Sequence, residues 1–521
     1  MINPQIKLKE KSTIIVSVKQ ANEIMNFTKQ LDRSRFGTLL ERSGMDSKPH
    51  QHEGVNWCID RELAPCAYGG VRGGVMADEM GLGKTIQMLG VMLCNFQRRT
   101  LIVLPKALIA QWVSAIESVL GHCPLLYHGP STKTLTEEEL RRAPIVISTY
   151  GMLRPDSPLL DIEWGRAIFD EAHHIRNNKT QKHLSAAKLK SGIMWFVTGT
   201  PIQNRESDLY SLFALLKIPK SAYTFSASKP NYGVVKELKK TLMIKRTKAS
   251  AKLELPKTTN HDITVTWKNE DERSVAEEVH AHLPMLNIYM DRANRFQSPW
   301  KKKILPFMCL TKQLCTTPKS LSKHVKKLTG QETVDGDAIR DPTPEDGGIM
   351  RAIEHSSKLD SVVKVILSRK NNGRMKLVFA HFRAEMSIVE QELRQGGMSV
   401  DVISGATSAP RRRAILDNLA TAPSDYVLLL QIQVGCEGLN LQEFSEVYFL
   451  SPNWNPAIED QAVARCHRIG QTQPVDIFRF SMEGFGRESI NIENYIADTQ
   501  INKRKKMITS DECWIGSPII V

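Results

Sequence analysis

Met76-Ala77-Asp78-Glu79-Met80-Gly81-Leu82-Gly83-Lys84-Thr85 ends in the Gly-Lys-Thr that nucleotide-binding loops require. The small apolar run at residues 74–77 predicts a strand, and residues 86–93 predict a helix. In that context a glycine loop directs backbone N–H groups and a positive helix N-terminus toward phosphates. We expect Lys84 to reach the β- and γ-phosphates and the Thr85 hydroxyl to help hold Mg²⁺.

The loop departs from the strict pattern at one position, because a glycine is usual where this chain has Asp78. A glycine turn that opens an ordinary helix is the alternative interpretation. The rest of the chain decides between the two.

The bulk composition limits what the chain can be. Its 521 residues exceed what one hydrophobic core usually supports, so we expect two or three domains. No apolar run approaches the roughly 20 residues of a membrane span, and the charged N-terminus lacks a signal-peptide core. The net charge of +14 favours a polyanionic partner such as nucleic acid. The nine cysteines include no Cys-x-x-Cys pair, which argues against a zinc site and fits a reducing compartment.

Short apolar strands alternate with helical patterns in two parts of the chain. The first series is expected at 101–104, 145–147, 167–169 and 195–197, and the second at 376–379, 400–403, 426–430 and 447–450. This rhythm predicts an α/β fold, with parallel sheets covered by helices on both faces. We therefore expect two α/β lobes.

A less regular stretch separates the two lobes. Residues 295–327 carry eight lysines and no acidic residue. Residues 330–348 are rich in Gly, Pro and Asp, which predicts a mobile linker. The basic segment either contacts phosphates or forms a solvated helical face, and the sequence leaves both open.

Asp170-Glu171-Ala172-His173 follows an apolar strand, at the edge where parallel sheets hold ligands. Asp170 is placed to coordinate Mg²⁺, directly or through water, and Glu171 to orient and deprotonate the attacking water. Phosphoryl transfer needs positioning and charge neutralisation more than covalent chemistry, so this small set of groups suffices. The alternative is an acidic turn between a strand and a helix.

Two further motifs follow strands or begin helices. Thr198-Gly199-Thr200-Pro201-Ile202-Gln203-Asn204 could link hydrolysis to a bound polymer through its hydroxyls, or could cap a helix. Residues 461–471 predict a helix begun near Pro456, on which Arg465 and Arg468 share a face. Across a cleft, that face could supply arginine fingers to the γ-phosphate, worth roughly 10³–10⁵ in rate. A basic surface pair is the alternative.

Taken in order, these segments resemble those of Swi/Snf-type helicase-like ATPases of helicase superfamily two, from about Lys48 to Met507. Residues 49–57 resemble the adenine-recognising entry motif, with Gln51 as the base-reading residue, and residues 78–85 match the family's own phosphate loop. Further matching segments are 101–112, 148–150, 170–177, 198–204 and 208–212 in the first lobe, and 377–382, 404–405, 433–441, 451–456 and 461–471 in the second. His174-Ile175-Arg176-Asn177 resembles the branch linked to post-replication repair and transcription termination, although no cysteine–histidine framework for its RING insertion is present.

The resemblance implies two RecA-like parallel-sheet lobes, with ATP and Mg²⁺ in the cleft between them and duplex DNA across both. The expected domains are an N-terminal extension (1–47), the first lobe (48–250), a helical insertion and linker (251–348), the second lobe (349–490) and a C-terminal brace or tail (491–521).

The resemblance also assigns roles to individual residues. The expected catalytic residues are Lys84, Asp170, Glu171, Arg465 and Arg468. The nucleotide is expected on Gln51, Asp78, Glu79, Met80, Gly81, Leu82, Gly83, Lys84, Thr85 and Gln461, and the metal on Thr85 and Asp170. The expected DNA contacts are Lys106, Thr149, Tyr150, Ser404, Arg411, Arg412, Arg413 and Asn440, with Lys245-Arg246-Thr247-Lys248 as a further candidate.

Some positions depart from the family or allow two interpretations. Gln431 and Cys436 stand where the family usually has a small hydroxyl residue and a glycine, which puts the efficiency of coupling in doubt. Trp454 is expected to brace its motif by packing. The run Lys503-Arg504-Lys505-Lys506 resembles a nuclear import signal, or it belongs to a brace helix packed on the first lobe.

We expect a DNA-dependent ATPase that translocates on duplex DNA without separating its strands and remodels chromatin or other protein–DNA complexes. The alternatives are a strand-separating helicase and a catalytically silent DNA-binding scaffold. The expected setting is a monomeric motor in the nucleus, or at a viral replication site, with nucleosomes among its candidate targets.

Overall fold

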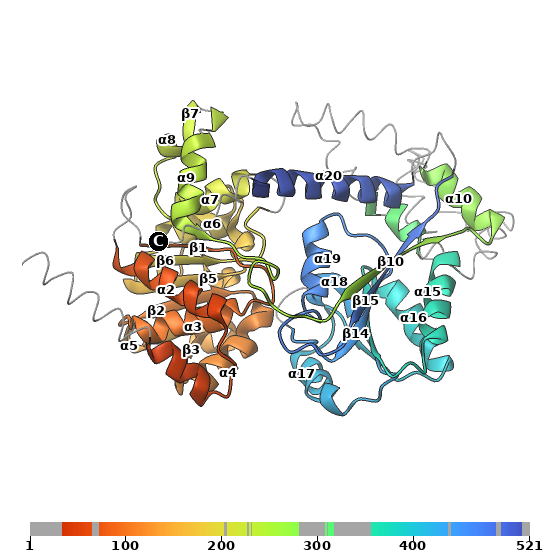
Figure 1. Ribbon diagram of the computed structural model, residues 1–521, viewed down its shortest axis with the longest axis horizontal. Coiled ribbons are helices and arrows are strands. Elements are labelled where there is room, and N and C mark those ends of the chain that lie inside the picture. Colours follow the sequence, from red (N-terminus) through yellow and green to blue (C-terminus); the bar gives the residue numbers. More distant parts are fainter. Residues whose placement is uncertain are drawn as a thin grey trace, which may run out of the picture.

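The chain folds into two parallel-sheet lobes, shown side by side in Figure 1. The computed structural model describes residues 34–64, 72–202, 206–226, 229–230, 232–280, 308–309, 311–316, 356–435, 439–485 and 491–512. The expected linker at 330–348, most of the basic segment 295–327, and Gln203, Asn204 and Cys436 lie outside these residues.

The first lobe is built on a seven-stranded sheet. Its strands are β1 (Arg72–Met76), β2 (Thr100–Leu104), β3 (Leu125–Tyr127), β4 (Ile145–Thr149), β5 (Trp164–Asp170), β6 (Ser191–Val197) and β9 (Met243–Ile244). Their order is β3-β4-β2-β5-β6-β1-β9, and all neighbours pair in parallel. The helices are α2 (Pro49–Leu63), α3 (Lys84–Cys94), α4 (Ile109–Leu120), α5 (Glu137–Arg142), α6 (Gln181–Lys188), α7 (Ser207–Leu215), α8 (Lys220–Tyr223) and α9 (Tyr232–Leu242). A small hairpin joins β7 (Thr224–Ser226) to β8 (Lys229–Pro230).

The second lobe is built on a six-stranded sheet. Its strands are β10 (Thr258–Val265), β11 (Met375–Ala380), β12 (Val400–Ile403), β13 (Val427–Gln431), β14 (Phe444–Phe449) and β15 (Val475–Met482). Their order is β10-β15-β14-β11-β13-β12, again with parallel pairing throughout. The helices are α10 (Glu270–His280), α15 (Ser357–Ser368), α16 (Arg383–Gln395), α17 (Ala409–Asp417), α18 (Ile432–Gly435), α19 (Pro456–Val463) and α20 (Ile492–Glu512). Every strand expected from the sequence in either lobe is therefore confirmed.

Each sheet carries a hydrophobic core on both faces. Along β2, Leu101 and Val103 belong to one buried cluster, while Ile102 and Leu104 belong to the other. Along β11, Leu377 and Phe379 alternate in the same way with Val378 and Ala380. Central strands buried on both faces have no polar face, which explains why the sequence shows continuous apolar runs rather than alternation.

The segment expected as a helical insertion, 251–348, contributes a strand to the second sheet. β10 pairs along its whole length with β15. The second sheet therefore begins soon after β9 ends the first, and only residues 245–257 join the two sheets. The expected boundary at residue 349 places this edge strand in the wrong domain.

The C-terminal helix α20 runs in Figure 1 from the second lobe toward the first. Its first turn is anchored in the second lobe, where the buried Glu493 carboxylate pairs with the buried Lys358 ammonium. Farther along, Lys503 donates to the Trp454 carbonyl (2.8 Å) and Arg504 pairs with Asp460 of α19 (2.8 Å). Lys503 and Arg504 thus hold this part of the helix to the second lobe, and the packing of a brace helix on the first lobe stays a prediction. No helix among the described residues is both long and apolar enough to cross a membrane.

Candidate active site between the two lobes

The predicted phosphate loop follows β1 and opens α3. Gly81 and Gly83 have φ values of +93° and +79°, in the left-handed region that favours glycine. Gly83 is the N-cap of α3, so the loop ends on the helix N-terminus. The Lys84 ammonium donates to the carbonyls of Asp78 (2.8 Å) and Glu79 (3.3 Å). These two bonds hold the positive charge of Lys84 at the opening of the loop. This is the strand–loop–helix arrangement that suits phosphates.

The carboxylate of Asp78 is fully buried. Arg246 donates to it from the backbone N–H (3.1 Å), from Nε (3.0 Å) and from a terminal nitrogen. Gln87 donates to the same carboxylate (3.2 Å) and accepts from Arg246 (2.8 Å). The Asp78 carboxylate is therefore committed to Arg246 and supports the loop from behind, and the assignment of Asp78 to the nucleotide-binding loop stays a prediction.

The predicted base-reading residue Gln51 lies against the same loop. Its amide donates to the Leu82 carbonyl (3.4 Å), and the neighbouring His50 ring nitrogen lies 3.1 Å from that oxygen. A Cβ built on Gly83 would approach the Gln51 amide nitrogen within 2.4 Å, so a side chain at position 83 would displace Gln51. Helix α2 is thus packed directly on the phosphate loop.

Asp170 and Glu171 lie at the carboxyl end of β5, both nearly buried. The Trp112 indole donates to Asp170 Oδ2 (2.7 Å), and the Glu171 backbone N–H donates to Oδ1 (3.0 Å). Glu171 has a φ of +51°, a strained conformation for a residue with a side chain. Such strain persists where the surroundings fix it, and here it turns the Glu171 carboxylate into the cleft.

The pKa values of Asp170 and Glu171 shift in opposite directions. Burial and the adjacent Glu171 charge raise the pKa of Asp170. Burial alone would raise the pKa of Glu171 as well, but His173, Arg465 and Lys84 bring it below its usual range. The His173 ring nitrogen lies 3.3 Å from Glu171 Oε2. Burial lowers the pKa of Lys84, against the opposing charges of Glu171, Asp78 and Asp170.

The two predicted arginine fingers come from a turn and not from a helix. Helix α19 ends at Val463, and residues 464–470 form successive turns. The backbone N–H groups of Cys466 and His467 both donate to the Val463 carbonyl, and Gly470 has a φ of +100°. The prediction that Arg465 and Arg468 share a helical face is therefore wrong.

The turn nevertheless brings both arginines to the first lobe. A terminal nitrogen of Arg465 lies 3.7 Å from Glu171 Oε1. Arg468 packs against the phosphate loop, because its Cβ would lie 3.2 Å from a Cβ built on Gly81. Its Nε atom is buried and has no hydrogen-bond partner in the structure. A buried guanidinium nitrogen beside a phosphate loop suits an anionic ligand.

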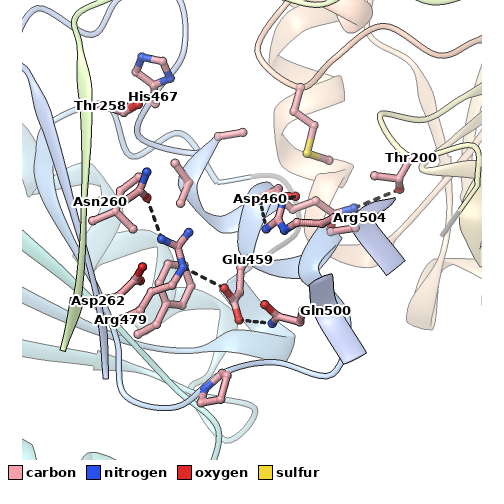
Figure 2. Close-up of a pocket in the computed structure, with 18 of the residues that line it drawn as sticks. Thr200, Thr258, Asn260, Asp262, Glu459, Asp460, His467, Arg479, Gln500 and Arg504 are labelled. Atoms are coloured by element: carbon pink, nitrogen blue, oxygen red, sulfur yellow. Dashed lines mark hydrogen bonds and ion pairs between the residues drawn. The ribbon is translucent and has the colours of Figure 1, made fainter. Parts of the chain in front are cut away.

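Gln461 also crosses the cleft, since its amide donates to the Thr200 hydroxyl at 3.5 Å. The adjoining cavity has a volume of about 830 Å³ and is lined by Thr200, the edge strand β10, helix α19 and helix α20. Figure 2 shows how these lining residues lie. In it Glu459 accepts from Arg479 (3.1 Å) and from Gln500 of α20 (2.8 Å). The cavity therefore continues the interlobe cleft beneath α20.

Four of the eight expected DNA contacts lie at the carboxyl ends of strands, and the eight differ in exposure. Lys106, Arg411, Arg413 and Asn440 are exposed. Arg411 pairs with Asp401 (2.6 Å), while Thr149 and Ser404 are only 5% and 8% exposed. Tyr150 is 3% exposed and its hydroxyl donates to the Asp170 carbonyl (2.7 Å). That side chain braces the end of β5, so it offers DNA no free hydroxyl.

The supporting roles of four residues were not predicted from the sequence: Trp112, His173, Arg246 and Lys248. Trp112 and Tyr150 hold Asp170, and His173 faces Glu171. Arg246 and Lys248 were assigned to DNA because they stand in a basic run, yet Arg246 holds Asp78 and Lys248 holds the second lobe (2.8 Å to the His467 carbonyl). The one sequence signal for a buried cationic partner was Asp78 itself, a carboxylate where the strict loop pattern has glycine.

Two family models match the chain. The SNF2-related domain matches residues 50–320, more than half of the chain, and the helicase conserved C-terminal domain matches residues 357–470.

Curated relatives come from a virus, animals and plants. The "Probable global transactivator" of Orgyia pseudotsugata multicapsid polyhedrosis virus is 28% identical, over 87% of this chain and 89% of its own length. The human "DNA excision repair protein ERCC-6-like" is 26% identical over 87% of this chain, which spans 41% of that protein. "Protein CHROMATIN REMODELING 24" of Arabidopsis thaliana is 26% identical over 85% of this chain and 45% of its own.

Among solved structures, the "Sulfolobus solfataricus SWI2/SNF2 ATPase core in complex with dsDNA" is 23% identical, with a TM-score of 0.37, over 90% of this chain and 94% of that one. The family assignment rests on the two family models and the site they enclose. The chain therefore belongs to the SNF2-related family and is a Swi/Snf-type, helicase-like ATP hydrolase.

Proposed function

We propose that this chain hydrolyses ATP between its two lobes and converts each closure of the cleft into a step along duplex DNA, without separating the strands. The observation that carries the proposal is the distance of 3.7 Å between Arg465 of the second lobe and Glu171 of the first. Catalytic groups from both lobes therefore meet in one place. Hydrolysis that requires both lobes is coupled to their relative motion.

We assign the residues of this site separate roles in phosphoryl transfer. Lys84 and the backbone N–H groups of the loop hold the phosphates. Glu171, kept ionised by its lowered pKa, orients the attacking water and accepts its proton. Arg465 and Arg468 stabilise the negative charge that develops in the transition state.

The site also suits Mg²⁺. Asp170 is a hard oxygen donor, and burial and the adjacent Glu171 charge raise its pKa; a divalent cation would stabilise the ionised form against both. Thr85 and Asp170 would hold the ion. When bound, Mg²⁺ neutralises phosphate charge.

We propose that duplex DNA binds both lobes through its phosphates. The exposed Lys106, Arg413 and Asn440 remain the best placed of the predicted contacts. Phosphate contacts carry little sequence information and weaken steeply with salt. Chromatin proteins are proposed targets, in the nucleus or at a viral replication site; the relatives named for chromatin remodelling and for viral transactivation support both settings.

The catalytic part of the proposal is tested by Glu171→Gln, which should retain ATP binding and lose turnover. Glu163→Gln is the matched control, because Glu163 is exposed next to the same strand, β5. Wild-type turnover in Glu171→Gln would refute the assigned base.

The motor part is tested by displacement of a third DNA strand from a triplex. ATP-dependent displacement without release of either duplex strand supports translocation. Release of a labelled duplex strand would favour the strand-separating helicase instead.

A further inference from the structure

The two sheets are joined by one short segment, residues 245–257, which runs from the end of β9 to the start of β10. This segment lies directly beside the phosphate loop. The Ala77 N–H donates to the Ile244 carbonyl (2.7 Å), and the Glu79 N–H donates to the Arg246 carbonyl (2.8 Å). The joint between the lobes therefore continues the backbone pairing of β1 into the nucleotide site.

Side chains strengthen this attachment to the first lobe. Arg246 is held by the buried Asp78 carboxylate through its backbone and its guanidinium. The Lys248 backbone N–H donates to Glu79 Oε2 (2.8 Å), and the Lys248 ammonium lies 3.6 Å from Glu79 Oε1. The backbone and the ammonium of Lys248 are thus both held by Glu79 of the phosphate loop, which fixes the direction of the Lys248 side chain.

The Lys248 side chain then crosses to the second lobe. Its ammonium donates to the His467 carbonyl at 2.8 Å, and the side chain is only 15% exposed. His467 stands between Arg465 and Arg468, so this bond holds the middle of the arginine turn. The His467 ring nitrogen also bonds the Pro256 carbonyl (2.8 Å), farther along the same joining segment.

The contact leaves little free space. A Cβ built on Gly81 would lie 3.2 Å from Arg468 Cβ and 3.4 Å from Lys248 Cε. The phosphate loop, the Lys248 stem and the arginine turn therefore leave no room for a side chain at position 81. A shift of the turn relative to the loop would first have to break the Lys248 bond.

We propose that Lys248 is a positioning residue, which sets the register of the Arg465–Arg468 turn against the phosphate loop so that both arginines arrive together when the cleft closes. The inference rests on the proposed hydrolysis between the lobes and extends it to a residue of the segment that joins them. A single ammonium on a long stem suits this role, since it carries three donors and serves Glu79 and the His467 carbonyl at once.

The test compares Lys248→Met, which keeps the apolar stem, with Lys248→Arg, which keeps the charge. Loss of one hydrogen bond from a charged donor should lower kcat roughly 10- to 100-fold. The KM for ATP and the unfolding temperature should stay near the wild-type values, and Lys248→Arg should recover part of kcat. Lys257→Met is the matched control, because Lys257 is an exposed lysine of the same segment.

A double-variant cycle separates positioning from a merely structural role. If Lys248 acts through the arginine turn, Lys248→Met should add little to the loss already caused by Arg465→Ala. Full additivity, or an unchanged kcat in Lys248→Met, would overturn the inference. An inactive wild-type protein would refute the proposed function itself, so the two failures can be told apart.

Discussion

Replacing Asp78 by the glycine of the strict phosphate-loop pattern should lower both the unfolding temperature and the affinity for ATP. In Asp78→Gly the fully buried carboxylate disappears, while the Arg246 side chain, 13% exposed, stays in place. The guanidinium then loses its buried counter-charge, and keeps the exposed Glu53 carboxylate at 3.7 Å and the neutral acceptors Gln87 Oε1 and the His50 carbonyl.

The size of the effect follows from this geometry. Breaking a buried ion pair by removing one partner costs about 3–5 kcal/mol. Because two neutral acceptors remain for Arg246, we take the lower end, about 3 kcal/mol. For a lobe of this size, that corresponds to a fall in unfolding temperature of roughly 6–12 °C. ATP should also bind more weakly, since Arg246 anchors the loop from behind.

Thermal unfolding and the binding of a fluorescent ATP analogue measure both effects. Asp156→Gly is the control, because Asp156 is 77% exposed and its pairing with Arg154 at 3.9 Å is a surface contact of little energetic weight. An Asp78→Gly protein with the wild-type unfolding temperature and ATP affinity would show that the Arg246 clamp does not stabilise the loop.

Three further predictions follow from the site and its supports. Arg465→Ala should retain ATP binding but lose roughly 10³-fold or more in kcat, because the group acts on transition-state charge; an unchanged kcat in steady-state hydrolysis would exclude the finger. Gly81→Ala should lower kcat well below that of Gly129→Ala, since both glycines have positive φ but only Gly81 faces the second lobe; equal rates would remove the close contact from the account. Burial lowers the pKa of His280 to about 4, so between pH 7 and pH 5 the unfolded chain binds a proton that the folded one does not, and the free energy of unfolding should fall by about 2 kcal/mol from this group. Urea unfolding at both pH values should show a smaller fall in His280→Phe than in the wild type, and an equal fall would refute the contribution.

The sequence predicted the strands well, because strands depend on local signals, whereas the catalytic roles of the predicted residues stay predictions. Central parallel strands such as β2 are buried on both faces and appear as unbroken apolar runs. The glycine loop and the acidic strand end at Asp170 carry their chemistry in adjacent residues. Resemblance to a family then supplied the pairing of the two half-sites.

The supporting contacts could not be predicted in the same way, because they join residues far apart in the chain. Arg246 and Asp78 are separated by 168 positions, and Lys248 and His467 by 219. The sequence of a basic run is the same whether its side chains are solvated or are held in buried ion pairs. The arginine turn was mistaken for helix because a spacing of three fits both structures, and only Gly470 marks the irregular backbone.

The most direct test of the account is steady-state ATP hydrolysis at one low salt concentration, with no nucleic acid, duplex DNA, single-stranded DNA or duplex RNA. The account predicts the largest stimulation by duplex DNA, lost at higher salt and absent in Lys84→Ala. Stimulation by RNA or single strands above that by duplex DNA, or hydrolysis that survives in Lys84→Ala, would contradict it.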